Sequence, residues 1–478
     1  MIDPMTILSR DELQRIHEAS LEILEQTGVK VHSDEGIDLL SIAGSEANIK
    51  DKTVKIPRTL VGEMISKSRR CKALFGRDPG YMLELGRGKT YMMTGSTAIQ
   101  VVDIETGKVR PSRRRDIEES ARVADALENV HIYCGMAEAL DYPSEIMRLE
   151  RFEAAVSNTT KHVAIGLQGT REARFIAKMA SAVVGSEEDH RKRPIVTQVQ
   201  CPVAPLMQYG PNVEAIIEGA RNGTPIMILS YGEAGMTVPV SLAGGIATAN
   251  ANGLAGLLIA WLANPEAPLI YHVEVESPTL TRTRDTHLQL GAGSVEVGLG
   301  NILGSQLARY YGFPNVAGLA IGDVIHGGIE SFLFSMCGVL SSLGKPDIMY
   351  GSGGGIGTDL SCSLLSYEQM VLGNDVAGAF LRMLRGVDAS QGTLEKSVAL
   401  VRKVGPEGHF MVKESIEDLS KEWYLPKILD VTEPARITEA AKEKAKKILS
   451  VHKVEPLAAE VKARLRRLID EAKADSRN

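Results

Sequence analysis

The chain has 478 residues, with 54 basic and 60 acidic side chains and a formal net charge of −6. A hydrophobic share of 44% and a charged share of 24% are typical of a globular protein with a large core. The mildly acidic balance excludes nonspecific nucleic-acid binding as the main role, because that role needs a basic surface.

The cysteines and the start of the chain indicate a reducing compartment. The five cysteines are scattered without a C-x-x-C pair, which argues against a disulfide framework or a zinc ribbon. The first residues have neither the basic flank nor the apolar run of a signal peptide. The longest apolar stretch, 253–263, is about half as long as a membrane-spanning helix. We therefore expect a cytoplasmic protein that does not bind a membrane.

Residues 1–125 are expected to form an N-terminal α+β section. Residues 9–27 predict a helix, since Ser9 and Glu12 form a capping-box pattern and apolar residues follow at helical spacing. Later in this section the pattern alternates as in strands, with a hairpin turn around Gly107.

Seven short apolar runs follow at intervals of roughly 30 to 47 residues, the repeat of successive βα units. Their continuous apolarity indicates parallel strands that are buried on both faces. An eighth, weaker strand is expected near 386–392. The count favours a closed barrel, so we predict an α/β fold with a TIM (β/α)8 barrel over 126–435. The runs are IYCGMA near 132, HVAIGL near 162, IVTQVQ near 195, IMILSY near 226, LIYHVEV near 269, VAGLAI near 316 and DIMYGS near 347.

The C-terminal region, 436–478, is rich in Lys, Ala and Glu, with apolar residues at helical spacing. It predicts one or two amphipathic helices, broken near Pro456. A solvated outer face explains such helices better than contact with a partner does.

In a closed barrel, catalytic groups come from the carboxyl ends of the strands and from the loops that follow. The chain contains neither a dinucleotide fingerprint at its first strand nor a P-loop. The run YHVEVES is the most informative strand end, because His272, Glu274 and Glu276 share one face of a strand. Three interpretations are open: a hydrogen-bonded polar layer, contact with a substrate, and a metal site. Other polar residues at strand ends are Gln168, Gln198, Gln200, Tyr231, Glu233 and Tyr350.

Two loops offer further candidates. Asp323 and His326 lie in one loop and either orient a substrate and move a proton, or serve as a helix cap and a surface histidine. Arg282 and Arg284 either pair with an anionic substrate end or belong to an ordinary surface loop.

The glycine-rich run 351–357 is either a phosphate cradle or an open loop above a pocket. It lacks the lysine and the serine or threonine of a P-loop.

Residues 236–271, MTVPVSLAGGIATANANGLAGLLIAWLANPEAPLIY, resemble the trimethylamine methyltransferase family. Members of that family have a T-x-P-x-[TS]-L-A-G segment, an N-A-x-x-L-A-G helix and an N-P-x-A-P turn. These elements begin here at Thr237, Asn250 and Asn264. Further matches in the same order are LSRDELQRIHEASLEILEQTGVKV near the start, QLARYYGFP at 306–314, SYEQMVLGNDV at 366–376, VGPEGHF at 404–410 and EWYLPKILD at 422–430.

The resemblance implies a TIM barrel that transfers a methyl group from a methylated amine to the Co(I) corrinoid (cobalamin) of a small partner protein. Founding members of the family contain pyrrolysine, whereas this chain has only standard residues and resembles the non-pyrrolysine branch. Characterised members of that branch demethylate quaternary amines such as glycine betaine. The partners implied are a cognate corrinoid protein, a small methylated amine and further copies of the chain, and no bound metal is expected.

The chemistry of methyl transfer is consistent with a quaternary substrate. A quaternary nitrogen leaves as a neutral amine, whereas a tertiary amine must first acquire a positive charge. Aromatic faces suit such a cation, at roughly 0.5–2 kcal/mol each. The aromatic candidates are Tyr91, Tyr231, Tyr271, Phe332, Phe334 and Tyr350. For a substrate carboxylate the candidates are His326, His272 and Arg282.

Together these arguments name Glu274, Asp323 and His326 as candidate catalytic residues. Candidate substrate-binding residues are Tyr91, Tyr231, His272, Arg282, Phe332 and Tyr350, and candidate corrinoid-binding residues are Gly351, Gly353 and Gly354. The charged strand YHVEVES and the loop IHGGIESF depart from the family pattern, so a different methyl donor remains an alternative. A non-catalytic protein that binds methylated amines is another.

Overall fold

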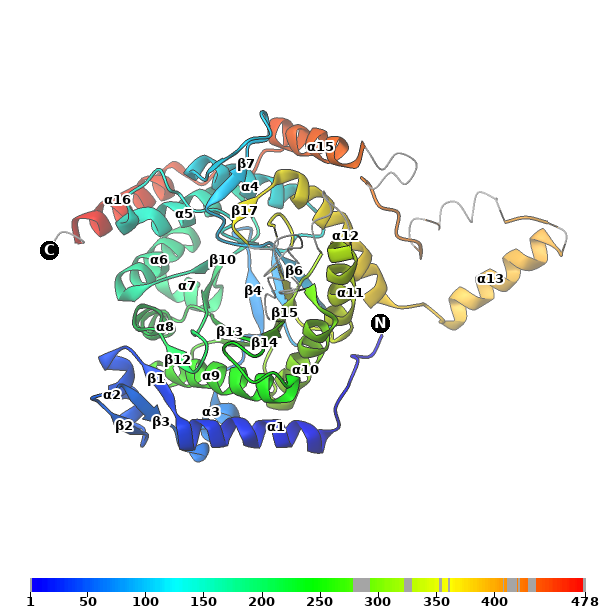
Figure 1. Ribbon diagram of the computed structural model, residues 1–478. Helices are drawn as coiled ribbons and strands as arrows, with labels where there is room; N and C mark the ends of the chain where they lie inside the picture. Colours follow the sequence, from blue (N-terminus) through cyan, green and yellow to red (C-terminus); the bar gives the residue numbers. More distant parts are fainter. Residues whose placement is uncertain are drawn as a thin grey trace, which may run out of the picture.

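A computed structural model describes residues 2–277, 293–321, 329–351, 355–359, 362–406, 408–410, 419, 422–428 and 436–475, with only the backbone described for 329–332. Eight parallel strands form its main sheet, in the order β14-β13-β11-β10-β9-β6-β16-β15 (Figure 1). A bridge between Tyr271 and Asn315 joins the two ends, so the sheet is a nearly closed barrel. The strands are β6 (Tyr91–Met93), β9 (Ile132–Cys134), β10 (His162–Gly166), β11 (Val196–Gln200), β13 (Ile226–Glu233), β14 (Leu269–Glu276), β15 (Val316–Gly318) and β16 (Ile348–Tyr350).

The predicted α/β barrel is confirmed, and each of the seven apolar runs coincides wholly or in part with one of its strands. The prediction of an eighth strand near 386–392 is wrong. The eighth strand is β6, which pairs with β9 and β16. β6 has only three residues, Tyr91–Met93, and polar residues and glycines flank it. In sequence it therefore looks like a strand of the neighbouring hairpins. The division at residue 125 stays a prediction.

A ring of helices surrounds the barrel (Figure 1). Each of these helices connects two strands or follows the last strand along the chain, as in successive βα units. They are α4 (Arg114–Ala126), α5 (Ser144–Asn158), α6 (Gly169–Val184), α7 (Glu187–Lys192), α8 (Gly210–Asn222), α9 (Leu242–Ala263), α10 (Val295–Tyr311), α11 (Ile329–Leu343) and α12 (Tyr367–Arg385).

Helix α9 contains most of the motif shared with the family, and its polar residues have structural partners. Asn250 donates from Nδ2 to the Ser20 and Tyr311 hydroxyls at 2.9 Å, and its Oδ1 accepts from the Tyr271 hydroxyl at 2.8 Å. Of the described helices, only α9 is long and apolar enough to cross a membrane, but 83% of its apolar window is buried inside the protein. Helix α9 is therefore a core helix of the protein.

The N-terminal section covers α9 from outside. Helix α1 (Arg10–Glu22) begins at Ser9 with the predicted capping box, continues as a π-helical turn and ends before Gly28. A four-stranded sheet and two short helices complete this layer and pack beside α8 and α9. These elements are β1 (Val29–Val31), β2 (Glu46–Asn48), β3 (Thr53–Lys55), β12 (Met207–Gln208), α2 (Asp34–Ile42) and α3 (Arg58–Lys67).

A hairpin of β4 (Ala73–Phe75) and β5 (Met82–Glu84) covers the amino-terminal end of the barrel. The Phe75 N–H donates to the Pro194 carbonyl at 3.3 Å, just before β11, and the Tyr81 hydroxyl donates to the His131 carbonyl at 2.8 Å, just before β9. Leu74 and Leu83 are buried among the strand starts. A second hairpin, β7 (Gln100–Val102) with β8 (Val109–Pro111), has the predicted turn and pairs with β17 (Leu364–Leu365).

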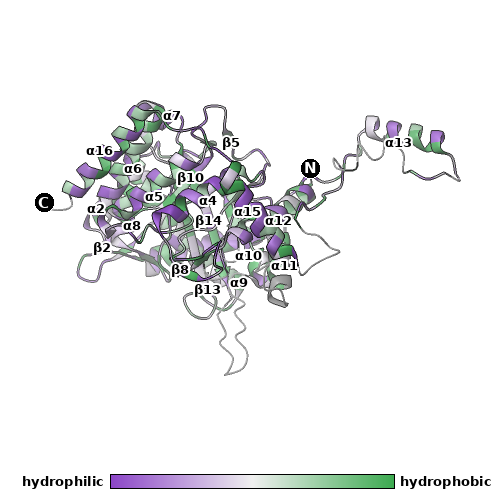
Figure 2. Ribbon diagram, turned by 90° about the horizontal axis from the view of Figure 1, so that it is seen from above, coloured by the Kyte–Doolittle hydropathy of each residue, from purple (hydrophilic) through white to green (hydrophobic). Residues whose placement is uncertain are grey.

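The C-terminal helices are α15 (Ile437–Val451) and α16 (Ala459–Asp475), as the sequence pattern predicts. Helix α16 packs on α5 and α6, and its residues Leu465 and Ile469 are buried there. Arg466 extends from α16 to Glu150 on α5, with N–O distances of 2.9 Å. By contrast, α13 (Gln391–Val404) stands clear of the barrel (Figures 1 and 2).

Candidate active site

Polar side chains gather inside the barrel at the carboxyl ends of its two longest strands. β13 and β14 pair in parallel over eight residues each, and Tyr231 is level with Glu274 and Glu233 with Glu276. Below this level most described interior side chains are apolar, apart from His162 and Thr197, whose Nε2 and Oγ1 atoms lie 2.8 Å apart. The buried apolar interior side chains are Met93, Ile132, Cys134, Ala164, Val199, Met227, Leu229, Ile270, Val316 and Ile348.

Glu274 is held by hydrogen bonds to two side chains. Its Oε2 lies 3.1 Å from His272 Nε2, and its Oε1 accepts from Asn301 Nδ2 at 3.1 Å. Asn301 in turn accepts the Gly318 N–H at 2.9 Å. A Cβ at position 318 would lie 2.9 Å from Glu274 Oε1, so the glycine makes room for the carboxylate. This arrangement fixes the direction of a carboxyl group that is 1% exposed.

His272 is also buried and lies against an aromatic ring. The centroids of its imidazole and of the Tyr231 ring are 5.0 Å apart. Its Nδ1 is buried and has no hydrogen-bond partner among the described residues. Buried polar groups normally have a hydrogen-bond partner. A bound molecule could therefore supply the partner that this nitrogen lacks among the described residues.

Glu276 has a perturbed acidity. Burial raises the pKa of its carboxyl to about 7, and the nearby Glu274 and Glu233 carboxylates add to the shift. Burial likewise raises the pKa of the Tyr231 phenol well above its ordinary value, with the neighbouring acidic groups contributing. At neutral pH the Tyr231 ring is therefore an uncharged aromatic face beside three carboxyl groups.

The opposite side of the barrel mouth carries neutral groups. The Tyr350 hydroxyl, at the end of β16, lies 2.6 Å from Ser96 Oγ. Burial raises the pKa of the Cys134 thiol to about 11 and that of the Cys362 thiol to about 12. The described mouth is thus acidic along β13 and β14, and neutral along β6, β9 and β16.

The structure brings together four of the predicted site residues, namely Glu274, His272, Tyr231 and Tyr350. It places Tyr91 at the other end of the barrel, where its hydroxyl accepts the Glu84 N–H at 3.1 Å. Tyr271 faces α9, and Phe334 is buried against α10. Asp323, His326, Arg282, Gly353, Gly354 and the side chain of Phe332 lie outside the described residues.

Gly351 has a packing reason to be glycine. A Cβ built there would lie 2.7 Å from the Gly355 Cα, so the chain closes on itself at this point. A contact of Gly351 with a corrinoid stays a prediction.

Several residues near the site had not been predicted. Ser96 follows β6, the strand that the sequence pattern missed, and Asn301 lies within the apolar α10. A buried pair, Arg151 with Glu138 at 2.7 Å, lies beside the ends of β9 and β10, and Arg151 also donates to the Gly166 carbonyl at 3.0 Å. Their only sequence signal is a polar residue in an otherwise apolar helix or loop.

The described residues contain no group of three or more His, Cys, Asp or Glu side chains placed to hold a metal ion. Glu274 uses both carboxylate oxygens for His272 and Asn301. Of the three interpretations for this strand, the hydrogen-bonded polar layer agrees with these contacts, and contact with a substrate stays a prediction.

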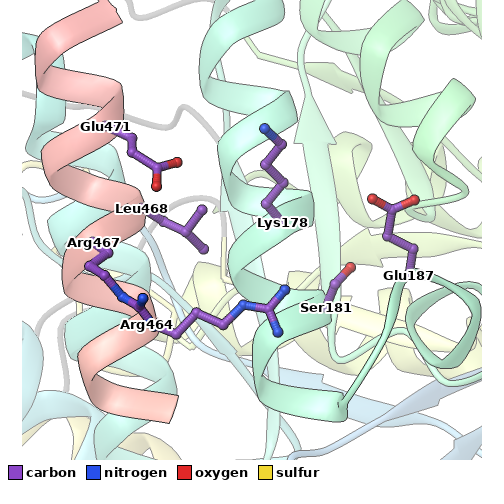
Figure 3. Close-up of a pocket in the computed structure, with 7 residues that line it drawn as sticks. All are labelled: Lys178, Ser181, Glu187, Arg464, Arg467, Leu468 and Glu471. Atoms are coloured by element: carbon purple, nitrogen blue, oxygen red, sulfur yellow. The ribbon is translucent and has the colours of Figure 1, made fainter. Parts of the chain in front are cut away.

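Two hollows among the described residues lie away from the carboxyl ends of the strands. One, of about 620 Å³, lies beside the β4–β5 hairpin and includes Arg70, Arg309 and Asp347. The other, of about 360 Å³, is a groove between α6 and α16 with side chains of both charges (Figure 3). Neither contains a residue of the polar network around Glu274.

Comparison with known proteins gives a consistent result. The family described as trimethylamine methyltransferase (MTTB) matches residues 1–476. Trimethylamine methyltransferase MttB of Desulfitobacterium hafniense (strain DSM 10664 / DCB-2) is 30% identical over 472 residues, which cover 97% of this chain and 93% of that protein. Trimethylamine methyltransferase MttB of Methanosarcina barkeri is 28% identical over 486 residues, covering 98% and 95%.

Two further matches differ in kind. The glycine betaine methyltransferase of Desulfitobacterium hafniense (strain Y51) is 26% identical over 436 residues, covering 90% of this chain and 88% of that protein. Among solved structures, the hydroxylamine MtmB complex aligns with a TM-score of 0.52 and 11% identity over 93% of this chain and 89% of that chain. This structural likeness concerns the fold alone.

Proposed function

Because the chain belongs to the trimethylamine methyltransferase family, we propose that it transfers a methyl group from a quaternary amine to the Co(I) corrinoid of a partner protein. Glycine betaine or a related betaine is the proposed donor. The proposal rests on one observation, the acidic wall of Glu233, Glu274 and Glu276 beside the Tyr231 ring at the carboxyl ends of β13 and β14.

The acidic wall and the ring suit a methylated ammonium group. Carboxylates attract the cation, and the face of Tyr231 adds a contact worth roughly 0.5–2 kcal/mol. During transfer the methyl–nitrogen bond breaks, and its electron pair stays on the nitrogen, which leaves as a neutral amine. The electron pair of Co(I) forms the new bond to the methyl carbon. No proton is needed for a quaternary donor.

Too strong an attraction would slow this reaction, because the positive charge disappears as the bond breaks. Glu276, whose pKa is raised to about 7, is only partly ionised at neutral pH and moderates the attraction. The main task of the described residues is then to orient the donor and to exclude water.

The carboxylate of a betaine would have to point away from the acidic wall. The neutral side, with Tyr350 and Ser96, offers hydroxyl donors for it. Arg282 and His326 stay predicted partners for the same carboxylate. The named glycine betaine relative supports a betaine as the donor.

Calorimetric titration tests the recognition step with a matched pair of ligands. Glycine betaine and 3,3-dimethylbutanoate have the same shape and the same carboxylate, but only glycine betaine has the positive nitrogen. We expect glycine betaine to bind at least 10-fold more tightly. Equal affinity, or tighter binding of 3,3-dimethylbutanoate, would contradict the role of the acidic wall.

A tertiary amine is the second candidate donor, and Glu276 favours it. A carboxyl with a pKa of about 7 holds a proton that it can give to the nitrogen of a tertiary amine. The protonated nitrogen then leaves as a neutral secondary amine after methyl transfer. Relatives named trimethylamine methyltransferase support this candidate. Product analysis after turnover with glycine betaine or trimethylamine as the single donor separates the two.

A further inference from the structure

The hollow beside the β4–β5 hairpin has a strongly basic wall. Its volume of about 620 Å³ is in the range of small-molecule pockets. Positive charge is concentrated in its lining, although the whole chain has a net charge of −6. The basic side chains are Arg70, Lys72, Arg87, Arg309 and Lys345, and the acidic ones are Glu84 and Asp347.

The cations of this wall have no counterion in direct contact. The structure forms no ion pair between any of the five and a carboxylate of the described residues. Arg309 Nη1 donates to the Gly344 carbonyl at 2.7 Å, and Lys345 Nζ donates to the Ile2 carbonyl at 2.8 Å. Arg70 likewise donates to two backbone carbonyls, at 2.9 and 3.1 Å. These carbonyl groups orient the cations but leave their full charges without a balancing anion.

Two cations at the rim are not engaged at all. The side chains of Lys72 and Arg87 are exposed and have no hydrogen-bond partner among the described residues. Lys72 precedes β4 and Arg87 follows β5, so both come from the hairpin that borders the hollow. Across the hollow, Lys345 has a φ of +50°, a left-handed conformation that residues other than glycine rarely adopt. Backbone strain of this kind is common at binding sites.

The two carboxyl groups of the lining have other partners. Asp347 accepts the N–H groups of Gly86 and Asn315, the second at 3.0 Å, and burial raises the pKa of its carboxyl. Glu84 Oε2 lies 3.8 Å from Nζ of Lys89, which is outside the lining. Both carboxyl groups are therefore engaged away from the five cations.

We propose that this hollow binds a small organic molecule that carries phosphate groups. Phosphate oxygens match guanidinium and ammonium donors, and a terminal phosphate has a charge of about −1.5 to −2 at neutral pH. Five positive and two negative side chains leave a lining charge of +3, which about two phosphate groups balance. Met82, Leu85 and Phe313 provide apolar surface for the carbon skeleton.

The proposed site is separate from the methyl-donor site. Its walls come from the N-terminal section and from the junctions between α10 and β15 and between α11 and β16, at the amino-terminal end of the barrel. Figure 2 shows β5, which borders the hollow, and β13 on opposite sides of the body. A ligand here bridges segments that are distant in the sequence and leaves the acidic wall at the carboxyl ends of β13 and β14 free.

Calorimetric titration of the full chain with ADP, inorganic diphosphate and adenosine tests the proposal, in magnesium-free buffer with about 0.15 M salt. We expect ADP to bind with a Kd of about 100 µM or lower. Adenosine lacks the charge and diphosphate lacks the carbon skeleton, so each should bind at least about 10-fold more weakly. Absence of ADP binding at about 1 mM would overturn the proposal, and so would equal affinity for ADP and either of the other two.

A pair of matched variants tests the position of the site. K72Q/R87Q removes the two side chains that make no contact in the fold, so it should fold normally and bind ADP at least about 10-fold more weakly. K178Q/R464Q removes the same charge from the groove between α6 and α16 and should bind ADP as the wild type does. Unchanged affinity of the first variant, or an equal loss in both, would overturn the assignment.

Hydrogen exchange provides a second test that needs no substitution. ADP should slow amide exchange in residues 84–88 and 309–315, which line the hollow, and saturating glycine betaine should leave the affinity for ADP unchanged. Protection confined to the carboxyl ends of β13 and β14, or competition between ADP and glycine betaine, would contradict a separate site.

Discussion

His272 Nε2 and Glu274 Oε2 lie 3.1 Å apart, two residues apart on the same strand, and both side chains are 1% exposed. The histidine is oriented by the carboxylate, and the carboxylate by Asn301, so the imidazole keeps one nitrogen for a bound molecule. Such a hydrogen-bonded pair fixes the direction of a group before the substrate arrives.

Replacing the carboxyl of Glu274 with an amide should weaken binding of a cationic donor. For Glu274→Gln we expect the KM for the donor to rise about 10-fold or more, which corresponds to about 1.4 kcal/mol. Steady-state methyl transfer with varied donor concentration measures the change. Glu46→Gln, at an exposed position on β2, is the matched control and should leave KM unchanged.

The pH profile should report Glu276. With a quaternary donor, kcat/KM should rise as pH passes through about 7, because the ionised carboxyl attracts the cation better. Glu276→Gln should remove this rise. A profile that falls through the same pH range would favour the second candidate, in which the protonated carboxyl is needed.

The same pKa shift affects stability in a defined direction. The folded chain keeps a proton on Glu276 that the unfolded chain loses between the ordinary pKa of 4.5 and about 7. Unfolding free energy of the wild type relative to Glu276→Gln should therefore decrease as pH rises through this window. Urea titrations at pH 5 and pH 8 measure the difference, and an increase in relative stability at pH 8 would contradict the assignment.

The buried pair of Arg151 and Glu138 should be essential for folding stability. Arg151→Met leaves the Glu138 carboxylate buried without its cation, at an expected cost of about 3–5 kcal/mol. Urea unfolding followed by circular dichroism measures the loss. Lys192→Met removes a partner of the exposed pair with Glu188 and should cost less than about 1 kcal/mol. Similar losses for both variants would show that burial is not the cause.

Two buried histidines predict sensitivity to acid. Burial lowers the pKa of His131 and His162 from 6.5 to about 4, because it disfavours the charged ring. Both rings also have hydrogen-bond partners inside the barrel wall. Their contribution to stability is present above pH 6.5 and is lost as pH falls toward 4, at about 1.4 kcal/mol per unit of pKa shift. For His162→Asn, the unfolding free energy should fall less steeply than the wild type's over this range.

The barrel could be predicted from the sequence because few folds other than one of parallel buried strands accommodate apolar runs at such regular intervals. It also identified the polar face of β14, since His272, Glu274 and Glu276 alternate with apolar residues. In β11 the polar residues named at the strand end, Gln198 and Gln200, lie on the outward face. Gln198 points toward Gly219 of α8, and the Gln200 side chain donates to the Leu167 carbonyl at 2.9 Å, outside the barrel. When both faces of a strand are buried, polarity alone does not tell which residues point inward.

The remaining errors have a related cause. β6 has only three residues and lies among hairpins, so no local pattern distinguishes it as a barrel strand. Tyr91 was predicted to bind the substrate because it is aromatic. It is the first residue of β6, however, and lies at the amino-terminal end of the barrel. The position of a residue along its strand decides which end of the barrel its side chain reaches. Predicting that position requires knowledge of the strand register.

The central claim is tested most directly by mixing the protein with chemically reduced cobalamin and glycine betaine under anaerobic conditions. The account predicts that the Co(I) spectrum is lost, and that methylcobalamin and dimethylglycine appear in equal amounts. The same mixture with trimethylamine should stay unchanged. Turnover of trimethylamine but not of glycine betaine or any other quaternary amine would contradict the account.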